Sequence, residues 1–174
     1  MRTNGRSLLY GVVSLVAAFI LIVIDQALKA LAVSVLKDKD PVIVIDGVFE
    51  FFYLENRGAA FGVFQGARIF FIVLTVAICA LAVYALIKTP VGRHFLVFRI
   101  TLVLLIAGAV GNFIDRLANG YVIDFLYFKL IDFPVFNFAD ICVTFAEILL
   151  ILDILFIYSS DDLKEVFGLH GEER

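Results

Sequence analysis

Four long apolar segments alternate with shorter polar stretches along this 174-residue chain. They cover residues 8–31, 69–87, 95–114 and 141–158. A helix needs about 20 mostly apolar residues to cross the hydrocarbon of a bilayer. The pattern therefore predicts an α-helical integral membrane protein with four transmembrane helices, in which both chain ends lie on one side.

The charges near the ends of these segments indicate orientation. Arg2 and Arg6 precede an uncharged run over residues 8–24, but no small-x-small cleavage site follows it, so we expect an uncleaved first helix. Basic residues are balanced between the two sides, yet the short 88–94 loop carries Lys88 and Arg93. Short loops report orientation best. We therefore expect both termini in the cytoplasm, with a polar tail over residues 160–174.

The two connections on the opposite side, residues 37–68 and 116–139, are unusually apolar. Residues 42–45 and 48–54 are rich in β-branched and aromatic side chains, and Asp46-Gly47 between them predicts a type I′ hairpin turn. Residues 122–138 are also apolar and aromatic, interrupted by Pro134. These segments predict a small β-rich structure against the helix ends or the membrane interface, and no separate soluble domain, so residues 1–174 are expected to form one membrane-embedded domain.

Composition narrows the function classes. Hydrophobic residues make up 63% of the chain and charged residues 18%, and the mean hydropathy is +1.04, which is outside the range of ordinary soluble domains. The net charge of −3 provides no basic field for nucleic acid. Cys79 and Cys142 lie in apolar runs, and His94 and His170 are isolated, so no metal site and no cofactor are expected.

Two aspartates are candidates for chemistry. Asp115 closes the third predicted helix and Asp140 opens the fourth, so both are expected at the same membrane face. Two close carboxylates share a proton, and such a pair can activate water and protonate a carbonyl oxygen without a metal. Two alternatives stay open, since Asp140 could be a helix N-cap and Asp115 could pair with Arg116.

Other polar residues within the apolar segments suggest supporting roles. Asp25 and Lys29 are spaced for an ion pair on one helix face, which either stands alone or braces the site. Asn112 shares a face with Asp115, while Gly108 and Gly111 permit close approach of a helix or a substrate.

Two further features have an open interpretation. The segment 56–62, Asn-Arg-Gly-Ala-Ala-Phe-Gly, allows close backbone approach to a ligand, or forms a compact turn into the second helix. Glu147 follows Asp140 by two turns and is expected to be buried and paired, with no assigned role.

At these residues the sequence resembles lipoprotein signal peptidase (signal peptidase II), an intramembrane aspartic protease family. Five patterns appear in the family's order: Asp25-x-x-x-Lys29, the 56–62 segment, Gly111-Asn112-x-x-Asp115-Arg116, Val122-Ile123-Asp124-Phe125 and Phe136-Asn137-Phe138-Ala139-Asp140. Each pattern is weak alone, but five in order on a frame of four helices are specific.

The resemblance implies an activity and a site. The family removes the signal peptide from bacterial prolipoproteins, cutting just before the diacylglyceryl-modified cysteine, and globomycin-type peptides inhibit it. It implies Asp115 and Asp140 as the catalytic pair, a β-rich cradle on the outer side, and a flap between helices three and four. The candidate supporting residues are Asp25, Lys29, Asn56, Gly58, Asn112, Arg116, Asp124, Asn137 and Ala139.

The same resemblance implies a multi-pass protein of the bacterial cytoplasmic (inner) membrane, monomeric, in contact with membrane lipids and with its active site near the outer face. Two other classes compete with it. A small proton-coupled transporter would also use intramembrane carboxylates, but it predicts polar residues throughout the membrane depth and often an internal repeat. A non-catalytic scaffold predicts that Asp115 and Asp140 matter only for stability.

Overall fold

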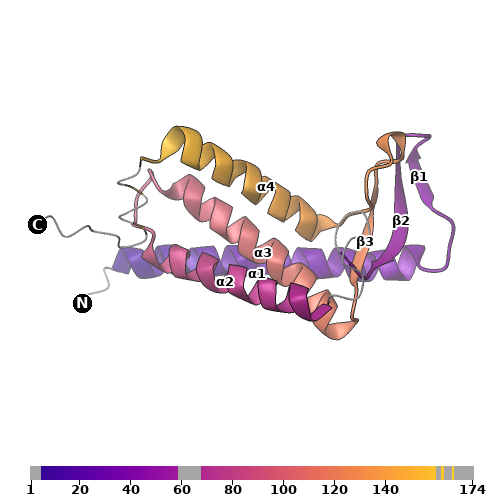
Figure 1. The fold of residues 1–174 in the computed structure, drawn as a ribbon, viewed down its shortest axis with the longest axis horizontal. Helices are drawn as coiled ribbons and strands as arrows, with labels where there is room; N and C mark the ends of the chain where they lie inside the picture. Colours follow the sequence, from indigo (N-terminus) through magenta and orange to yellow (C-terminus); the bar gives the residue numbers. More distant parts are fainter. Residues whose placement is uncertain (1–4, 59–67, 160–161, 163–165, 167–174) are drawn as a thin grey trace, which may run out of the picture.

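The computed structural model describes residues 5–58, 68–159, 162 and 166. Its helices run side by side, and a small sheet lies across one end of them (Figure 1). The first turn of α1 and the last turn of α4 lie at the opposite end (Figure 1). The element bounds are α1 Gly5–Leu36, β1 Val42–Ile45, β2 Phe49–Asn56, α2 Arg68–Lys88, α3 Leu96–Ala118, β3 Val122–Tyr127, the 3₁₀ helix η2 Lys129–Ile131, α4 Phe138–Leu152 and the π-helical turn η3 Asp153–Ile157.

Among the described residues, three helices are long and apolar enough to cross a membrane: Ser7–Leu36, Ile69–Lys88 and Leu96–Ala118. Their outward side chains are large and apolar; Leu8 is 67% and Ile69 77% exposed. Such surfaces require lipid rather than water. The chain is therefore a multi-pass membrane protein.

The predicted fourth helix, residues 141–158, differs in its bounds. α4 begins earlier, at Phe138, and ends after 15 residues at Leu152, where the π-helical turn continues to Ile157. A π turn is a common local distortion of an α-helix. The interruption leaves α4 shorter than a membrane-spanning helix, although 138–157 together extend about 30 Å.

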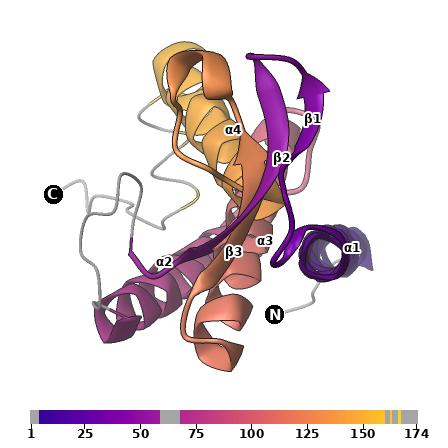
Figure 2. The ribbon, with the colours of Figure 1, turned by 90° about the vertical axis from the view of Figure 1, so that its right-hand side faces the viewer.

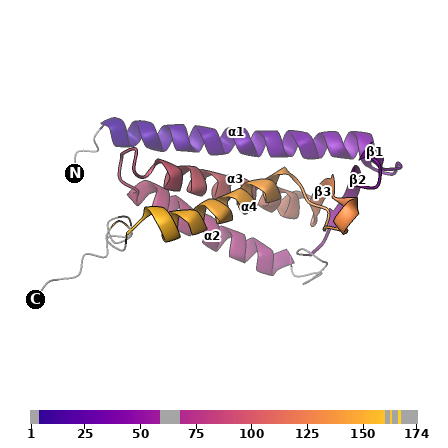
Figure 3. The same cartoon turned by 90° about the horizontal axis from the view of Figure 1, so that it is seen from above.

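The helix α3 is central to the bundle. It packs against α1, α2 and α4, and the end-on view shows it between the other three (Figure 2). Seen from above, α1 extends along the full length of the bundle and beyond it beneath the sheet (Figure 3). The third helix was expected to end at residue 114, but it continues to Ala118. Asp115 therefore lies within the last turns of α3 rather than after it.

The predicted hairpin is confirmed, with a different turn. β1 and β2 pair antiparallel with Ile45 opposite Phe49, and Val48 N–H donates to the Ile45 carbonyl at 3.0 Å. Gly47 has a φ of 70°, whereas Asp46 does not have a positive φ. A type I′ turn needs positive φ at both central residues, so that prediction was wrong.

The apolar connection between α3 and α4 adds the third strand. β3 pairs antiparallel with β2, and the chain then returns so that Phe136 exchanges backbone hydrogen bonds with Leu126. The sheet order is β1-β2-β3. Phe125 packs with Ala32 and Leu36 of α1 beneath the sheet. The sheet thus joins the C-terminal end of α1 to the segment that leads into α4.

Candidate functional site

A buried lysine organises the charged residues shared by α1 and α3. Lys29 is 1% exposed, and its Nζ lies 2.9 Å from Asp25 Oδ2 and 3.0 Å from Asp115 Oδ2. The predicted Asp25–Lys29 ion pair is confirmed. Asp115 pairs with Lys29 rather than with its neighbour Arg116, so that alternative was wrong. Both oxygens of Asp115 are hydrogen-bonded, since Oδ2 also accepts from Ile123 N–H and Oδ1 accepts from Gln26 Nε2.

Asp25 also fixes the start of α4. Its Oδ1 accepts a hydrogen bond from Ala139 N–H at 2.9 Å, in the first turn of that helix. First-turn N–H groups lack partners within their own helix and favour a negative charge. Gly111 makes this approach possible, because a Cβ at Gly111 would lie 2.6 Å from Asp25 Oδ2. A Cβ at Gly108 would meet Ala139 and Val143, so both glycines serve helix packing.

Asn112 connects this cluster to Asp140. Its Oδ1 accepts from Lys29 Nζ at 2.9 Å, and its Nδ2 donates to Asp140 Oδ1 at 2.7 Å. Since one amide serves both groups, the lysine fixes the orientation in which Asn112 presents a donor to Asp140.

Asp140 belongs to a capping box rather than being the N-cap itself. Asn137 is the N-cap of α4, and its side chain accepts from Asp140 N–H at 3.0 Å. Asp140 Oδ2 in turn accepts from Asn137 N–H at 3.0 Å. This reciprocal arrangement stabilises helix starts. The N-cap alternative for Asp140 was therefore wrong by three residues.

The sheet supplies another carboxylate, Asp124 of β3. In the register of β2 and β3, Asn56 lies opposite Val122, which places Asn56 and Asp124 on the same face of the sheet. Asn56 Nδ2 donates to Asp124 Oδ2 at 2.8 Å, and Asn137 Nδ2 donates to Oδ1 at 2.6 Å. Burial, and next the negative charge of Asp140, raise the pKa of Asp124 to about 7.

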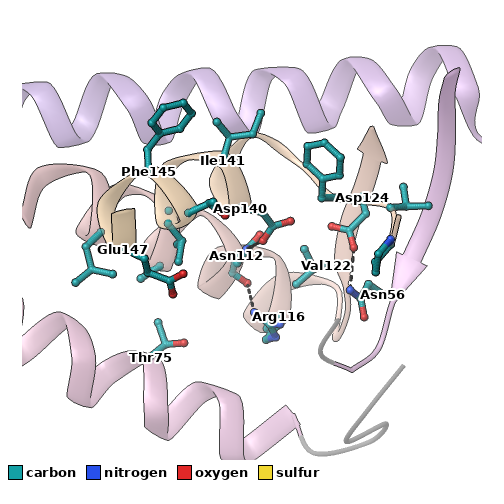
Figure 4. A pocket seen from close by; sticks show the side chains of 18 of the residues that line it. Asn56, Thr75, Asn112, Arg116, Val122, Asp124, Asp140, Ile141, Phe145 and Glu147 are labelled. Carbon is teal, nitrogen blue, oxygen red and sulfur yellow. Dashed lines mark hydrogen bonds between the residues drawn. The ribbon is translucent and has the colours of Figure 1, made fainter. Parts of the chain in front are cut away.

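A cavity of about 600 Å³ opens between α2, α3, α4 and the sheet (Figure 4). Both Asp124 and Asp140 line it, together with Asn56, Asn112 and Arg116. Asp115, Asp25 and Lys29 are not among its lining residues. Of Asp25, Asp115, Asp124 and Asp140, the last two are therefore in a position to meet a ligand.

Gly58 and Arg116 complete the polar wall. Gly58 N–H donates to Asn56 Oδ1 at 3.0 Å, which orients the Asn56 amide so that its nitrogen faces Asp124. Arg116 Nη2 donates to the Gly58 carbonyl at 3.4 Å, and its guanidinium lies over the Phe71 ring. These contacts attach the end of β2 to α3.

The structure thus brings the predicted site residues together at one end of the bundle, in two groups. One group is buried: Asp25, Lys29, Asp115, Asn137 and Ala139. The other lines the cavity: Asn56, Gly58, Asn112, Arg116, Asp124 and Asp140. Asn112 and Asn137 connect the two groups through their hydrogen bonds to Lys29, Asp124 and Asp140. Residues 59–62 of the predicted segment lie outside the described residues. Sequence reasoning missed Gln26, whose Nε2 contacts Asp25, Asp115 and the Gly111 carbonyl.

Comparisons with known proteins agree with one another. The family model described as signal peptidase (SPase) II matches residues 17–156. The "Lipoprotein signal peptidase" of Streptococcus thermophilus is 42% identical over 137 residues, covering 79% of this chain and 88% of that protein. The protein of the same name from Symbiobacterium thermophilum is 42% identical over 149 residues, covering 83% and 95%.

Solved structures of two bacterial membrane enzymes resemble this chain in fold. A structure described as a bacterial membrane enzyme determined by the in meso method at 2.3 Å resolution matches with a TM-score of 0.75 at 32% identity, covering 93% of this chain and 94% of that one. A second, at 1.9 Å, matches with a TM-score of 0.73 at 34% identity, covering 84% and 94%. With most of its length matched by the family model and by relatives at about 40% identity, the chain belongs to the signal peptidase II family.

Proposed function

We propose that this chain is an aspartic endopeptidase that removes the signal peptide from diacylglyceryl-modified bacterial prolipoproteins, cutting just before the lipidated cysteine. Membership of the family supports the substrate class. The observation that carries the catalytic type is a pair of carboxylates, one buried and one half-buried, that face one cavity and have neutral amides as their nearest hydrogen-bond donors.

We assign the pair to Asp124 and Asp140. Asn137 binds both, since its Nδ2 donates to Asp124 while its backbone N–H donates to Asp140. The raised pKa of Asp124, caused by burial and by Asp140, supports a single proton shared between the two groups near neutral pH. The ionised carboxylate takes a proton from water, and the protonated one donates to the scissile carbonyl oxygen.

This assignment replaces Asp115 of the sequence prediction with Asp124. Asp115 is 2% exposed and is bound by a lysine, a glutamine and a backbone N–H. Asp115 does not line the cavity, so it has no direct contact with a water molecule or substrate bound there. We therefore propose that Asp115 has a structural role and holds Lys29 in place.

The surroundings of the cavity fit a substrate that arrives within the bilayer. Its walls are mostly apolar and include Ile78 of α2 and Phe145 of α4. Exclusion of bulk water strengthens the interactions of the two carboxylates. We propose that α1, α2, α3 and the 138–157 segment make four spans of a single membrane-embedded domain, 1–174.

The remaining expectations follow from the same proposal. The sheet forms an outer cradle, and the connection between α3 and α4 acts as a flap. Both termini lie in the cytoplasm, and the site lies near the outer face of the bacterial cytoplasmic membrane. The protein works as a monomer surrounded by lipids, and globomycin-type peptides inhibit it by filling the cavity.

Cleavage of a purified diacylglyceryl-modified prolipoprotein tests the proposal. We expect Asp124→Asn and Asp140→Asn to lose at least a thousandfold in kcat, about 4 kcal/mol of barrier, while their thermal melting shows a folded protein. Asp115→Asn is the matched comparison, and any loss of activity there should follow its loss of stability.

The outcomes separate the assignments. An inactive but fully stable Asp115→Asn beside an active Asp124→Asn would restore the pair Asp115 and Asp140. Failure of the wild-type protein to cut this substrate would contradict the proteolytic function and return attention to a proton-coupled transporter.

A further inference from the structure

The polar face of α4 continues past the proposed catalytic centre. Asp140, Thr144 and Glu147 are spaced by four and three residues, so they lie on one face of the helix, and all three line the cavity. Glu147 was expected to be buried and paired. It is exposed instead, and among the described residues it makes no hydrogen bond or ion pair.

The cavity extends to Glu147 along the bundle. α2 and α4 both pack on α3, whose Leu105, Gly108 and Ala109 line the cavity between them. Thr75 of α2 and Glu147 of α4 point into the cavity from opposite sides (Figure 4). In addition to its polar wall near the sheet, the cavity therefore contains a carboxyl group and two hydroxyl groups between α2 and α4.

The depth of Glu147 makes it costly to keep there without a function. It is the tenth of the 20 residues between Phe138 and Ile157, close to the middle of that segment. Acidic side chains at the centre of a bilayer are rare and mark pathways or binding sites. Helix packing gives no reason for this one, because Glu147 points into the cavity.

We propose that Glu147, with Thr144 and Thr75, forms a polar subsite that binds a hydrogen-bond-donating side chain, such as a serine or threonine hydroxyl, in the membrane segment of the substrate. The inference rests on the proposed proteolytic function and adds a determinant of substrate choice. A carboxyl group offers acceptor oxygens to a hydroxyl donor, and within lipid that donor has no water to bind.

The position of the matching substrate residue follows from helix geometry. Seven residues separate Asp140 from Glu147, which is about 10 Å along the helix axis. A substrate helix in the groove places the bound residue about seven residues before the cut, and an extended segment places it about three before the cut. We therefore expect a preference for serine at one of these two positions before the cut.

A serine scan tests the subsite. Each substrate carries one serine in an otherwise Leu/Ala membrane segment, at positions two to nine before the lipidated cysteine, and kcat/KM is compared with the all-Leu/Ala reference. We expect serine at the matched register to raise kcat/KM about tenfold for the wild-type protein, the effect of one hydrogen bond. Serine two residues away, on the opposite face of a helix, should give no increase.

Variants then assign the preference to Glu147. Glu147→Leu should reduce the serine preference to about onefold while still cutting the reference substrate. Glu147→Gln keeps an acceptor oxygen and should retain part of the preference. Ile148→Leu, at an exposed neighbour that does not line the cavity, is the control and should leave the preference unchanged.

Two results would overturn the inference in distinguishable ways. If the wild-type protein cuts the reference substrate but shows no serine preference, or the same preference as Glu147→Leu, the subsite is wrong and the proteolytic function stands. If the wild-type protein does not cut the reference substrate, the proposed function fails, and the subsite fails with it.

Discussion

Two pairs of aspartates lie at the same end of this bundle in opposite chemical settings. Asp25 and Asp115 both contact the Lys29 ammonium group, at 2.9 and 3.0 Å. Asp124 and Asp140 receive hydrogen bonds from asparagine side chains and a backbone N–H. A bound cation makes a buried carboxylate a structural element, whereas neutral donors leave it able to exchange a proton. We call Asp25, Lys29 and Asp115 the brace. The nature of the bound donor distinguishes the carboxylates of the brace from the carboxylates of the cavity more clearly than their burial does.

Removal of the cation should have the largest effect on stability. Lys29→Met leaves Asp25 and Asp115 buried without a counter-charge, and we expect a loss of about 3–5 kcal/mol in the free energy of unfolding. Thermal melting in detergent measures it. Lys37→Met is the matched control, since Lys37 pairs with Glu55 at a partly exposed site and its loss should change the melting temperature little. Equal effects of the two variants would contradict the role of Lys29 as a brace.

A smaller effect on stability is expected at Gly111 of α3, which lies against the Asp25 carboxylate. Gly111→Ala places a Cβ against the Asp25 carboxylate, 2.6 Å from Oδ2, and should destabilise the fold by about 1–3 kcal/mol. Gly11→Ala, in α1 with open space around it, should stabilise the helix by about 0.5–1 kcal/mol. Melting curves of the two variants should therefore shift in opposite directions, and a Gly111→Ala protein of wild-type stability would show that the contact gives way easily.

The pH dependence of cleavage should belong to the cavity pair. The pKa of Asp124 is raised to about 7, so its proton is present below pH 7 and is lost as the pH rises through that value. Activity should therefore fall about tenfold for each pH unit above 7, which corresponds to about 1.4 kcal/mol. A stable Asp115→Asn protein should keep this alkaline limb. Its disappearance in that variant would assign the limb to Asp115 instead.

The smallest expected effect comes from Gln26, which donates hydrogen bonds to Asp25 and Asp115. Gln26→Leu removes the donor that contacts Asp115 Oδ1, Asp25 and the Gly111 carbonyl. We expect a loss of about 1 kcal/mol in stability and an unchanged kcat for the folded protein. A kcat that falls sharply while the melting temperature stays constant would indicate that Asp115 takes part in the chemistry.

Sequence patterns anticipated the fold where the signal was long and periodic. α1, α2 and most of α3 lie where the apolar runs predict them, and the strands flank Asp46-Gly47 as expected. The end of α3 was missed because Asp115 and Arg116 looked like a polar boundary, whereas Lys29 neutralises Asp115 within the helix. The start of α4 was missed because Asn137 and Asp140 are both good capping residues, and the choice between them depends on reciprocal bonds.

The sequence predicted which residues lie near the site, but not which of them contact one another. The spacing of Asp25 and Lys29 revealed their ion pair, since both lie on one helix. Nothing in the spacing showed that Lys29 reaches across to Asp115, or that the β2–β3 register brings Asn56 to Asp124. Those contacts join residues 68 to 86 positions apart in the chain, and they are set by tertiary packing.

The hydrogen bond from Ala139 to Asp25 also constrains how the protein is made. A ribosome releases α1 first, so Asp25 and Lys29 enter the membrane before α3 and α4 exist. During that interval the two charges have only each other, and the start of α4 has no place to dock until α3 brings Gly111 alongside. The proposed active site is therefore completed only when α4 is in place, so a nascent chain that stops short of residue 140 lacks one of the two proposed catalytic carboxylates.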